Sequence, residues 1–518
     1  MKLKTLYLLP LFVTSIRATT GRSYLSLRPY FETGTTERIA IDSIIYQHTD
    51  TRGSLSIVPF GGQSTDSNEI AKYFMPNNNC SIVLAEDNAP FERDINANYL
   101  GIVSAPVYDK TSSEIQDLES SMTYASRLNF CPKAETFGCG FIFRYIFENK
   151  MWADISTAII HKRHKLNPCE CALSSGGTGP NGFGYSSVLQ SMCYNSSPFK
   201  YGRIVNFVQT KTGAPQLELR LGCIQQNEYR SLRPYIGIDI PTGNKPCQTF
   251  LFEPTIGNNQ HTGIFLGLQG TQTIMKTDET VVCLSGDFVI RYLAPNTQTR
   301  SFDLKHRPWS RYMWVWRNDD NLSDPSVATN VDNALARLDY LINYSTLSAR
   351  VSPNAHLDAA VTFHVNRGNF KVEAGYHAFA SQKEKLELRA NIIDHIGLSA
   401  FSNYLANWSS SDPQPATRSF NTPDGRTFGA QQSVIDYNYT PGGSVTYSPT
   451  YIPITTCDLD LESGSIPAQF IHSLFASFGY RWEHNHPVGL FAGISYDISA
   501  DCNAFNRWLA WLQLSLEF

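Results

Sequence analysis

Ten segments of this chain alternate apolar and polar residues with a period of two, and they occur as five neighbouring pairs. A period of two is the repeat of a β-strand, whose successive side chains point to opposite faces. A short turn joins the members of each pair, as at Asn366–Asn369. The pairs are Cys139–Phe147 with Met151–His161, Gln216–Cys223 with Leu232–Ile240, Thr262–Ile274 with Thr280–Leu293, Ala355–Val365 with Phe370–Ala380, and Phe470–Trp482 with Val488–Ile498. The chain is therefore predicted to consist of antiparallel hairpins.

The charges within these segments fall almost entirely on one face. In Thr280–Leu293 the even positions are apolar, whereas Asp287 and Arg291 are odd. A Lys or Arg that faced lipid at the middle of a bilayer would cost about 2–4 kcal/mol. A soluble β-sandwich would instead place its charges on an outer, solvated face. The period alone does not separate these two cases, so the ends of the chain and the loop lengths must do so.

Both ends of the chain favour a membrane barrel. Lys2 and Lys4 precede an apolar run, and residues 1–18 have the layout of a secretory signal peptide. The final segment, Trp508–Phe518, alternates strictly and resembles the carboxy-terminal insertion signal of bacterial outer-membrane barrels. We expect the barrel-assembly machinery to recognise this strand. The expected signal residues are Trp508, Leu514, Leu516 and Phe518.

Composition agrees with a barrel and argues against nucleic acid as a partner. Aromatic residues make up 12% of the chain and charged residues only 17%, below the usual fraction of about 25%. The remainder of the chain has no apolar run of the roughly 18 residues that a membrane helix needs. Removing residues 1–18 takes away three basic side chains and shifts the net charge from −4 to about −7.

We therefore predict an all-β fold: a transmembrane, antiparallel, up-and-down β-barrel of about 12 strands, within a range of roughly 10–14. The opening strand comes from Gly53–Phe60 or Tyr99–Val107. The short turns and the carboxy terminus are expected in the periplasm, and the long loops outside the cell. The expected division is residues 1–18 as signal peptide, 19–135 as an N-terminal segment that includes the first strand, and 136–518 as the outer-membrane barrel. The N-terminal segment is expected either to plug the barrel or to form a disordered periplasmic extension.

The long loops are predicted to contain two short helices, at Val331–Tyr344 and Leu386–Ile396, because apolar residues recur there at helical spacing. The aromatic segment Pro308–Trp316 is expected in the outer girdle or in a further strand. Eleven cysteines are present, an odd number. Cys169 and Cys171 near Cys193 favour a disulfide staple over a metal site.

The polar face of the predicted strands is expected to line the lumen. It contains both signs of charge, so it favours neither cations nor anions strongly. It is consistent both with a salt-bridged filling and with a polar path for a solute. The predicted lumen-lining residues are Arg144, Asp154, Glu218, Arg220, Arg233, Asp239, Asp287, Arg291, Asp358, Lys371, Glu373, Arg481 and Asp497.

Two segments, Thr212–Gly222 and Tyr235–Lys245, resemble a hairpin of FadL-like outer-membrane channels, including barrels of the phenol-degradation-pathway (MetA) type. In both cases the hairpin ends in Pro-Thr-Gly and a polar residue. Phe252–Asn259 and Arg300–Leu304 are also similar to segments of uncharacterised barrels from intracellular Gram-negative bacteria. The resemblance implies a barrel that transports small, hydrophobic solutes. The Gly/Ala-rich hatch with which FadL-type transporters begin is not found in the first 130 residues.

The leading functional hypothesis is a passive outer-membrane channel for small solutes, in contact with outer-membrane lipid. The alternative is a closed structural or surface-interaction barrel that acts through its extracellular loops. An enzyme is not expected, because the adjacent His472 and Ser473 must face opposite sides of their strand. No cofactor, metal or catalytic residue is predicted.

Overall fold

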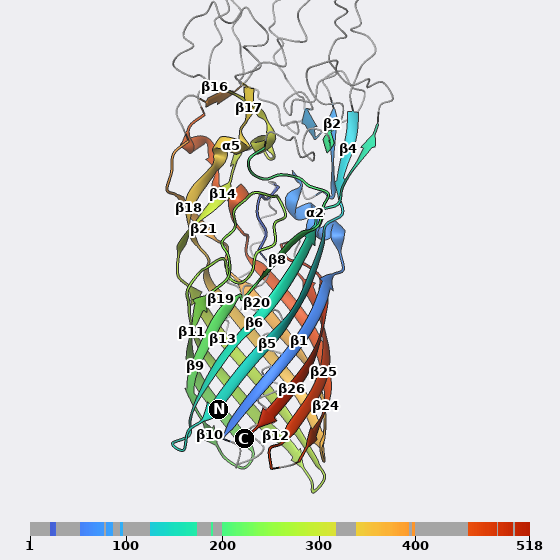
Figure 1. Cartoon of the computed structure of the whole chain (residues 1–518), viewed down its shortest axis with the longest axis vertical. Helices are drawn as coiled ribbons and strands as arrows, with labels where there is room; N and C mark the ends of the chain where they lie inside the picture. Colours follow the sequence, from blue (N-terminus) through green and yellow to red (C-terminus); the bar gives the residue numbers. More distant parts are fainter. Residues whose placement is uncertain are drawn as a thin grey trace, which may run out of the picture.

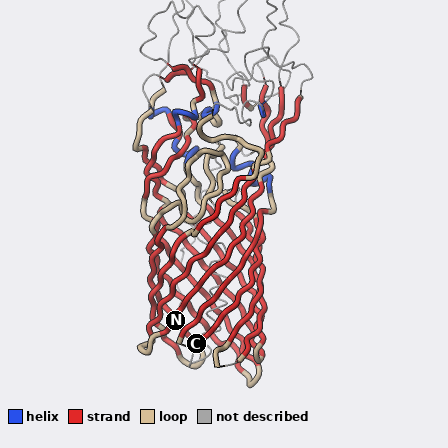
Figure 2. Tube along the Cα trace, viewed as in Figure 1, coloured by secondary structure: helices blue, strands red, loops and turns tan. Residues whose placement is uncertain are grey.

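The computed structural model describes residues 21–26, 52–76, 79–85, 94–96, 125–173, 188–189, 199–317, 338–392, 396–398, 454–483, 485–500 and 503–518. In this part of the chain, antiparallel strands form an upright barrel below a cap of shorter elements (Figures 1 and 2). The barrel strands are β1 (Gly53–Ser64), β5 (Lys133–Ile146), β6 (Met151–Lys165), β8 (Gln209–Gly213), β9 (Gln216–Cys223), β10 (Gln225–Gln226), β11 (Arg230–Pro241), β12 (Gly263–Lys276), β13 (Thr280–Leu293), β19 (Asn354–Arg367), β20 (Phe370–Ser381), β24 (Gln469–Trp482), β25 (Val488–Ser499) and β26 (Arg507–Glu517).

The barrel is closed and has 12 strand positions, because β8, β9 and β10 are consecutive pieces of one interrupted strand. β9 pairs with β6 on one side and β11 on the other, and β1 joins β26 to β5. Pro215 lies between β8 and β9 and has no backbone N–H to donate to a neighbouring strand, so the strand is interrupted there. The predicted barrel class and strand number are confirmed. The opening strand is β1, whereas Tyr99–Val107 lies outside the described residues.

All five predicted hairpins are present. Their turn ends lie close to the predicted positions, but several strands continue further at the loop end of the barrel. β5 begins at Lys133 rather than Cys139, and β6 ends at Lys165 rather than His161. Pairing is unbroken from Ile146–Trp152 to Lys133–Lys165, so the hairpin extends beyond its apolar stretch into a charged one.

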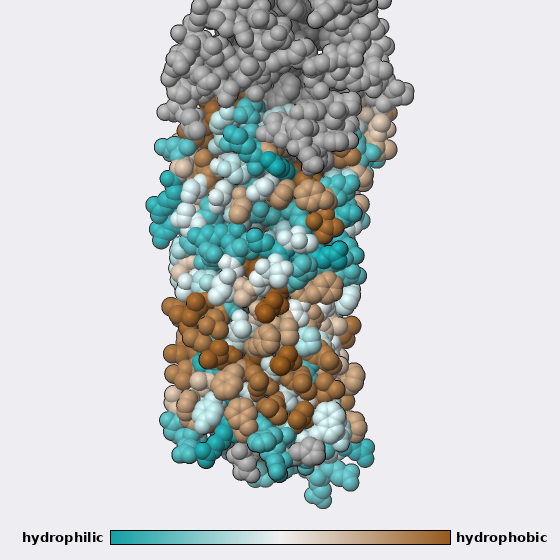
Figure 3. All heavy atoms as spheres, viewed as in Figure 1, coloured by the Kyte–Doolittle hydropathy of each residue, from teal (hydrophilic) through white to brown (hydrophobic). Residues whose placement is uncertain are grey.

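The outer surface of the barrel has an apolar belt (Figure 3). On β12, Ile264 and Leu266 are 62% and 63% exposed, while Phe265 between them is 1% exposed. Aromatic rings flank the belt near the turns, where Phe370 and Tyr480 meet edge to face. The outward side chains are thus apolar, whereas the inward ones are of both kinds: Phe265 is buried, and so is Gln269 beside the exposed Leu268.

Among the helices of the described residues, none is both long and apolar enough to cross a membrane.

The cap at the loop end contains short strands and helices from four of the long connections. Its helix α2 (Ser67–Phe74) begins at Asp66, whose carboxylate accepts from the N–H groups of Asn68 and Glu69. The other cap elements are β2 (Ser81–Ala85), β3 (Ile95–Asn96), β4 (Ala125–Phe130), β7 (Pro168–Ala172), β14 (Asn296–Ser301), β15 (Asp303–Leu304), η3 (Ser310–Tyr312), β16 (Trp314–Arg317), β17 (Leu338–Tyr340), α5 (Ile342–Ser345), β18 (Thr346–Ser352), β21 (Lys385–Leu388), β22 (Ile396–Leu398), η6 (Thr456–Asp458), β23 (Leu459–Asp460) and η7 (Leu461–Gly464).

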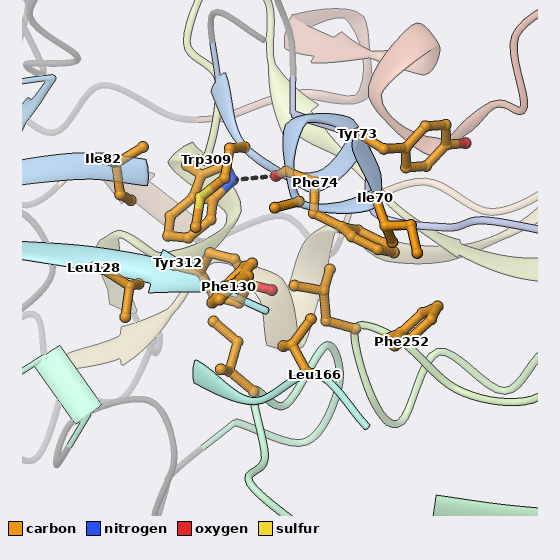
Figure 4. Packing of buried hydrophobic residues seen from close by; sticks show 14 of the residues in the cluster. Ile70, Tyr73, Phe74, Ile82, Leu128, Phe130, Leu166, Phe252, Trp309 and Tyr312 are labelled. Carbon is orange, nitrogen blue, oxygen red and sulfur yellow. Dashed lines mark hydrogen bonds between the residues drawn. The ribbon is translucent and has the colours of Figure 1, made fainter. Parts of the chain in front are cut away.

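The cap has its own aromatic core (Figure 4). Trp309 stacks on Phe130 with ring centroids 6.0 Å apart, and its indole N–H donates to the carbonyl of Phe74 at 2.7 Å. Phe74 in turn packs edge to face on Phe252. The cap is therefore a packed layer, and it fixes the loops relative to the barrel rim.

Both helix predictions for the loops are wrong in the described residues. Leu338–Tyr340 forms β17, which pairs with β16, and only Ile342–Ser345 is helical. The predicted helix Leu386–Ile396 instead begins with β21, which pairs with β18. In both cases pairing with a distant strand overrides the local spacing of apolar residues. Residues 318–337 and 393–395 lie outside the described residues.

The aromatic segment Pro308–Trp316 is not part of an outer girdle. Trp309 is buried in the cap core, Ser310–Tyr312 forms η3, and a strand begins only at Trp314. The expectation of a further strand is thus met only by this short cap strand. Cys169 and Cys171 have free, exposed thiols, and their expected partner Cys193 lies outside the described residues.

Candidate functional site

The inward face of the barrel is buried and carries many charged and polar side chains, with apolar clusters such as Trp152, Tyr235, Phe265 and Val289 among them. The structure places 12 of the 13 predicted lumen residues on this face with at most 5% of their surface exposed, and the side chain of Arg481 is 12% exposed. Because the strands continue around a closed barrel, these side chains converge from all sides. Most of them take part in ion pairs, which form within one strand, between neighbouring strands or across several strands, as Arg291 of β13 does with Glu218 of β9.

The largest set is an arginine ladder, which we define as Arg144, Arg220 and Arg291 with the three carboxylates between them. Arg144 donates to Asp154 at 2.7 Å, and Arg220 pairs with Glu218 at 2.6 Å and lies 3.8 Å from Asp154. Arg291 continues the ladder, 3.1 Å from Glu218 and 2.7 Å from Asp239. Charges alternate along the ladder, so the set is formally neutral.

Aromatic rings support the guanidinium groups of the ladder. Arg144 lies 4.8 Å from the ring centroid of Trp152, and Arg291 lies 4.6 Å from that of Phe265. Arg220 lies between Tyr235 and Phe265, at 4.9 and 5.5 Å. Planar guanidinium groups suit such stacking. The ladder is thus held by ring contacts together with ion pairs, and the planar guanidinium group suits both.

The other predicted residues form smaller sets on the remaining strands. Lys371 pairs with Glu373, which also accepts from Ser477 at 2.7 Å. Asp358 lies 3.0 Å from the ring of His377. The remaining contacts are Asp287 with Tyr235 at 2.9 Å, Asp497 with Arg507 at 2.6 Å, Arg481 with Glu517 at 2.9 Å, and Arg233 with Ser231 at 3.0 Å.

A small pocket, open to solvent, lies where the barrel meets the cap; the space around its lining is about 400 Å³ when open solvent is counted. We call it the mouth pocket. The loop between β11 and β12 and the loop-end tips of β13, β19, β20 and β24 surround it. Its lining is Ser26, Asn258, Asn259, His261, Leu293, Pro353, His356, Phe379, Ser381, Gln382, Glu384, Ile466 and Gln469. The mixed lining offers apolar contact together with a few fixed polar groups, as small-molecule sites do.

Hydrogen bonds fix the orientation of the polar groups in the mouth pocket. The Nδ1 of His261 donates to the carbonyl of Ala294 at 2.8 Å, so its Nε2 accepts from Gln298 at 2.8 Å. Burial lowers the pKa of His261 to about 4, so the ring is neutral at neutral pH. Burial also raises the pKa of Glu384, against the opposing effect of Arg300 at 3.3 Å.

Two buried atoms of the pocket have no hydrogen-bond partner among the described residues. They are Oδ1 of Asn258 and Nδ1 of His356. The amide of Asn258 donates to the carbonyl of His261 at 2.6 Å, which turns the acceptor oxygen away from that bond. A buried acceptor without a partner is costly, so a bound molecule with a hydroxyl or amine donor would be stabilised here.

The segment Gly21–Ser26 reaches the pocket at Ser26, which belongs to its lining. Tyr24 donates to Oδ1 of Asn259 at 2.7 Å, and the ring of Tyr24 lies 3.8 Å from the guanidinium carbon of Arg300. The amide N–H of Ser23 donates to the carbonyl of Ser463 at 2.8 Å. These contacts attach the segment to both the barrel rim and the cap.

The mouth pocket was not predicted from the sequence. The sequence contained only an indirect indication of it. Asn258 and Asn259 lie in Phe252–Asn259, and Arg300 begins Arg300–Leu304, the two segments similar to uncharacterised barrels. His472 and Ser473 point to opposite faces, toward Tyr376 outside and toward Asp497 inside. In the described residues, no group of three or more His, Cys, Asp or Glu side chains is placed to hold a metal ion.

Neither a protein-family model nor a curated protein sequence matches the chain. Solved outer-membrane structures are similar to the chain at low scores. They include an outer membrane channel from Pseudomonas putida F1 (8% identity, 91% of this chain and 97% of that one, TM-score 0.35). A Pseudomonas aeruginosa FadL homologue (9%, 90% and 90%, 0.28) and the Pseudomonas putida toluene transporter TodX (7%, 96% and 95%, 0.26) are similar as well. Identities and TM-scores this low say nothing about the solute.

Proposed function

We propose that this chain is a bacterial outer-membrane channel for small solutes, with the mouth pocket as the first site that a solute occupies. The observation that carries the proposal is the lining of this pocket, which places apolar and polar groups together at the mouth of the barrel. Its apolar lining at Leu293 and Phe379, beside the unpaired acceptor of Asn258, suits a small uncharged molecule that carries a hydrogen-bond donor.

The outer surface supports residence in a membrane. Outward positions of the central strand stretches are apolar, while charge is buried inside.

The tight turns would lie in the periplasm and the cap outside the cell. At the loop end, Lys133, Arg163 and Lys165 surround Glu135, which pairs with the first two, and the net positive charge of this rim suits the phosphates of an outer leaflet. Labelling intact cells with a membrane-impermeant maleimide tests this, because Cys247 and Cys457 are exposed on the cap side.

A second candidate is a closed structural barrel that acts through its loops. It is favoured by the burial of the ladder, whose charged side chains are at most 3% exposed. In that case the ion pairs are a permanent filling, and the cap is the working surface. The two candidates differ in one measurable property, namely whether solute crosses the barrel.

Permeation through purified, full-length protein separates the candidates. Planar-bilayer conductance and uptake of small uncharged solutes into proteoliposomes are expected to exceed those of protein-free membranes. The variant Asn258→Leu removes the unpaired acceptor and is expected to lower solute uptake several-fold. Asn206→Leu, at an exposed position outside the pocket lining, serves as the matched control. A barrel that is folded but silent in both assays would reject the channel and favour the closed barrel.

We also propose that the N-terminal segment narrows the mouth, as a plug would. The hydrogen bonds of Tyr24 and Ser23 to the rim and cap support this. The double variant Arg22→Ala with Tyr24→Ala removes contacts to Ser465 and Asn259 and is expected to raise conductance. Unchanged conductance in a folded variant would count against the plug.

A further inference from the structure

The barrel hairpin β5–β6 continues beyond the rim as the cap strands β4 and β7. The chain passes from β4 to β5 through Cys131-Pro132, and from β6 to β7 through Leu166-Asn167. Asn167 has a positive φ of 48°, and its side-chain amide donates to the carbonyl of Cys131 at 2.9 Å. The backbone N–H of Cys131 lies 3.2 Å from the carbonyl of Leu166. The two strands are therefore held together at this joint.

The register brings Cys131 and Cys169 to one face of this strand pair. Phe130 lies opposite Pro168, and Asn129 lies opposite Cys169. Phe130 and Pro168 are buried against the cap core, so Asn129, Cys131 and Cys169 share the other, solvent-facing side. Cys131 is thus the diagonal neighbour of Cys169 across the pair.

The thiols of Cys131 and Cys169 lie close enough to influence each other. Burial, and then the neighbouring Cys169, raise the pKa of Cys131, and Cys80 adds to this effect from the start of β2. β2 is the other neighbour of β4 in the sheet. Cys80, Cys131 and Cys169 are all exposed and carry free thiols in this structure, so an oxidant from solvent can reach each of them.

We propose that Cys131 and Cys169 are a redox pair that closes to a disulfide at the joint between barrel and cap, with Cys80 as a third thiol beside it. The proposal rests on the proposed function only in that export delivers the chain to an oxidising compartment. The required oxidant is a disulfide-bearing molecule or protein.

The exchange balances in two steps. One cysteine thiolate attacks the disulfide of the oxidant, which forms a mixed disulfide and releases one thiolate of the oxidant. The second cysteine then attacks the protein sulfur of that mixed disulfide and releases the other half of the oxidant as a thiol. The pair loses two protons and two electrons and gains one S–S bond, while the oxidant is reduced to two thiols.

The bond would close the open end of the β5–β6 hairpin and fix β4 and β7, two strands of the four-stranded cap sheet, to the rim. Cys171 is a poorer partner, because it lies opposite Arg127, two residues further along β7. The cysteines of the barrel wall, Cys139, Cys223 and Cys283, lie on strands below the joint. The pairing is therefore specific to the joint.

The test uses purified, full-length protein with oxidised glutathione as the oxidant. After remaining thiols are blocked with N-ethylmaleimide, peptide mass spectrometry is expected to find Cys131 linked to Cys169 in most molecules. Cys131→Ser and Cys169→Ser are each expected to abolish the link and leave the remaining thiol as a glutathione adduct. Cys80→Ser and the exposed control Cys247→Ser are expected to retain it.

Two outcomes would overturn the proposal. One is recovery of both thiols, blocked by maleimide or capped singly by glutathione, in protein whose barrel is shown to be folded by its resistance to SDS without heating. The other is a dominant link from Cys131 or Cys169 to a different cysteine, including Cys193 and Cys502. The link is assayed without a membrane, so a silent barrel that contains it would reject the channel and leave the redox pair standing.

Discussion

Arg291 shows, at the scale of one residue, how a full charge is accommodated inside this barrel. Its guanidinium contacts two carboxylates, Asp239 at 2.7 Å and Glu218 at 3.1 Å, and lies against the ring of Phe265. A buried ion pair contributes little net stability, because desolvation offsets its attraction. Removing only the arginine is strongly destabilising, however, because it leaves the two carboxylates buried without a compensating positive charge.

Arg291→Met is therefore expected to destabilise the barrel by about 3–5 kcal/mol. Denaturant unfolding from lipid vesicles measures the loss. Arg230→Met is the matched control, because Arg230 is exposed at the turn end of β11, and its loss is expected within about 0.5 kcal/mol. Equal losses in the two variants would contradict the ladder as described.

His261 gives the mouth pocket a pH dependence. Its folded-state pKa of about 4 lies below the ordinary value of 6.5, so between these values the unfolded chain binds a proton that the folded chain does not. Stability contributed by the neutral ring is thus complete above pH 6.5 and is lost as the pH falls toward 4, by up to roughly 3 kcal/mol. His261→Asn is expected to flatten this part of the profile, measured by unfolding at each pH. The other buried histidines are present in both the wild-type protein and the variant. If stability falls equally with pH in the two proteins, His261 is not the group responsible.

At the scale of elements, the barrel strands could be predicted from the sequence and the cap elements could not. In a strand such as β13, apolar residues recur every two positions because they face outward, while polar residues between them face inward. This pattern can be read from the strand's own sequence. Leu386 belongs to a strand only because β18 lies beside it, and no local spacing reveals that partner. The same holds for β17, where pairing with β16 replaced the predicted helix.

Two glycines with positive φ, one in a turn and one in a loop, test how closely the backbone segments approach each other. Gly368 in the β19–β20 turn and Gly257 in the β11–β12 loop have φ of 55° and 80°. An added Cβ has open space at Gly368 but would lie 2.2 Å from the carbonyl oxygen of Pro215 at Gly257. Gly368→Ala is expected to cost about 1–2 kcal/mol from the left-handed backbone alone, and Gly257→Ala clearly more. Equal costs in urea unfolding would mean that the close approach to Pro215 is absent.

For the whole molecule, the candidate site combines features that depend on the local sequence to different degrees. The inward charges were predictable one at a time from alternation, but the pairing of Arg291 with Glu218, 73 residues away, depends on how strands β9, β11, β12 and β13 follow around the barrel. The mouth pocket depends on more still, because it lies where strand tips, a loop and the segment Gly21–Ser26 meet. Such a site follows from closure of the barrel and from no single segment.

Membrane residence is a property of the whole barrel, and a pair of substitutions on β12 tests it. Leu268 lies in the middle of the apolar belt, and Ile274 lies near the turn on the same strand; both are exposed. In a bilayer, Leu268→Arg is expected to cost about 2–4 kcal/mol and Ile274→Arg about 0–1 kcal/mol, because the penalty depends on depth. Reversible unfolding from lipid vesicles measures both. On a water-soluble barrel an arginine at either exposed site would change stability by no more than about 0.5 kcal/mol, so near-equal, small effects would place this barrel in water, whereas a steep difference between the two positions places its belt in lipid.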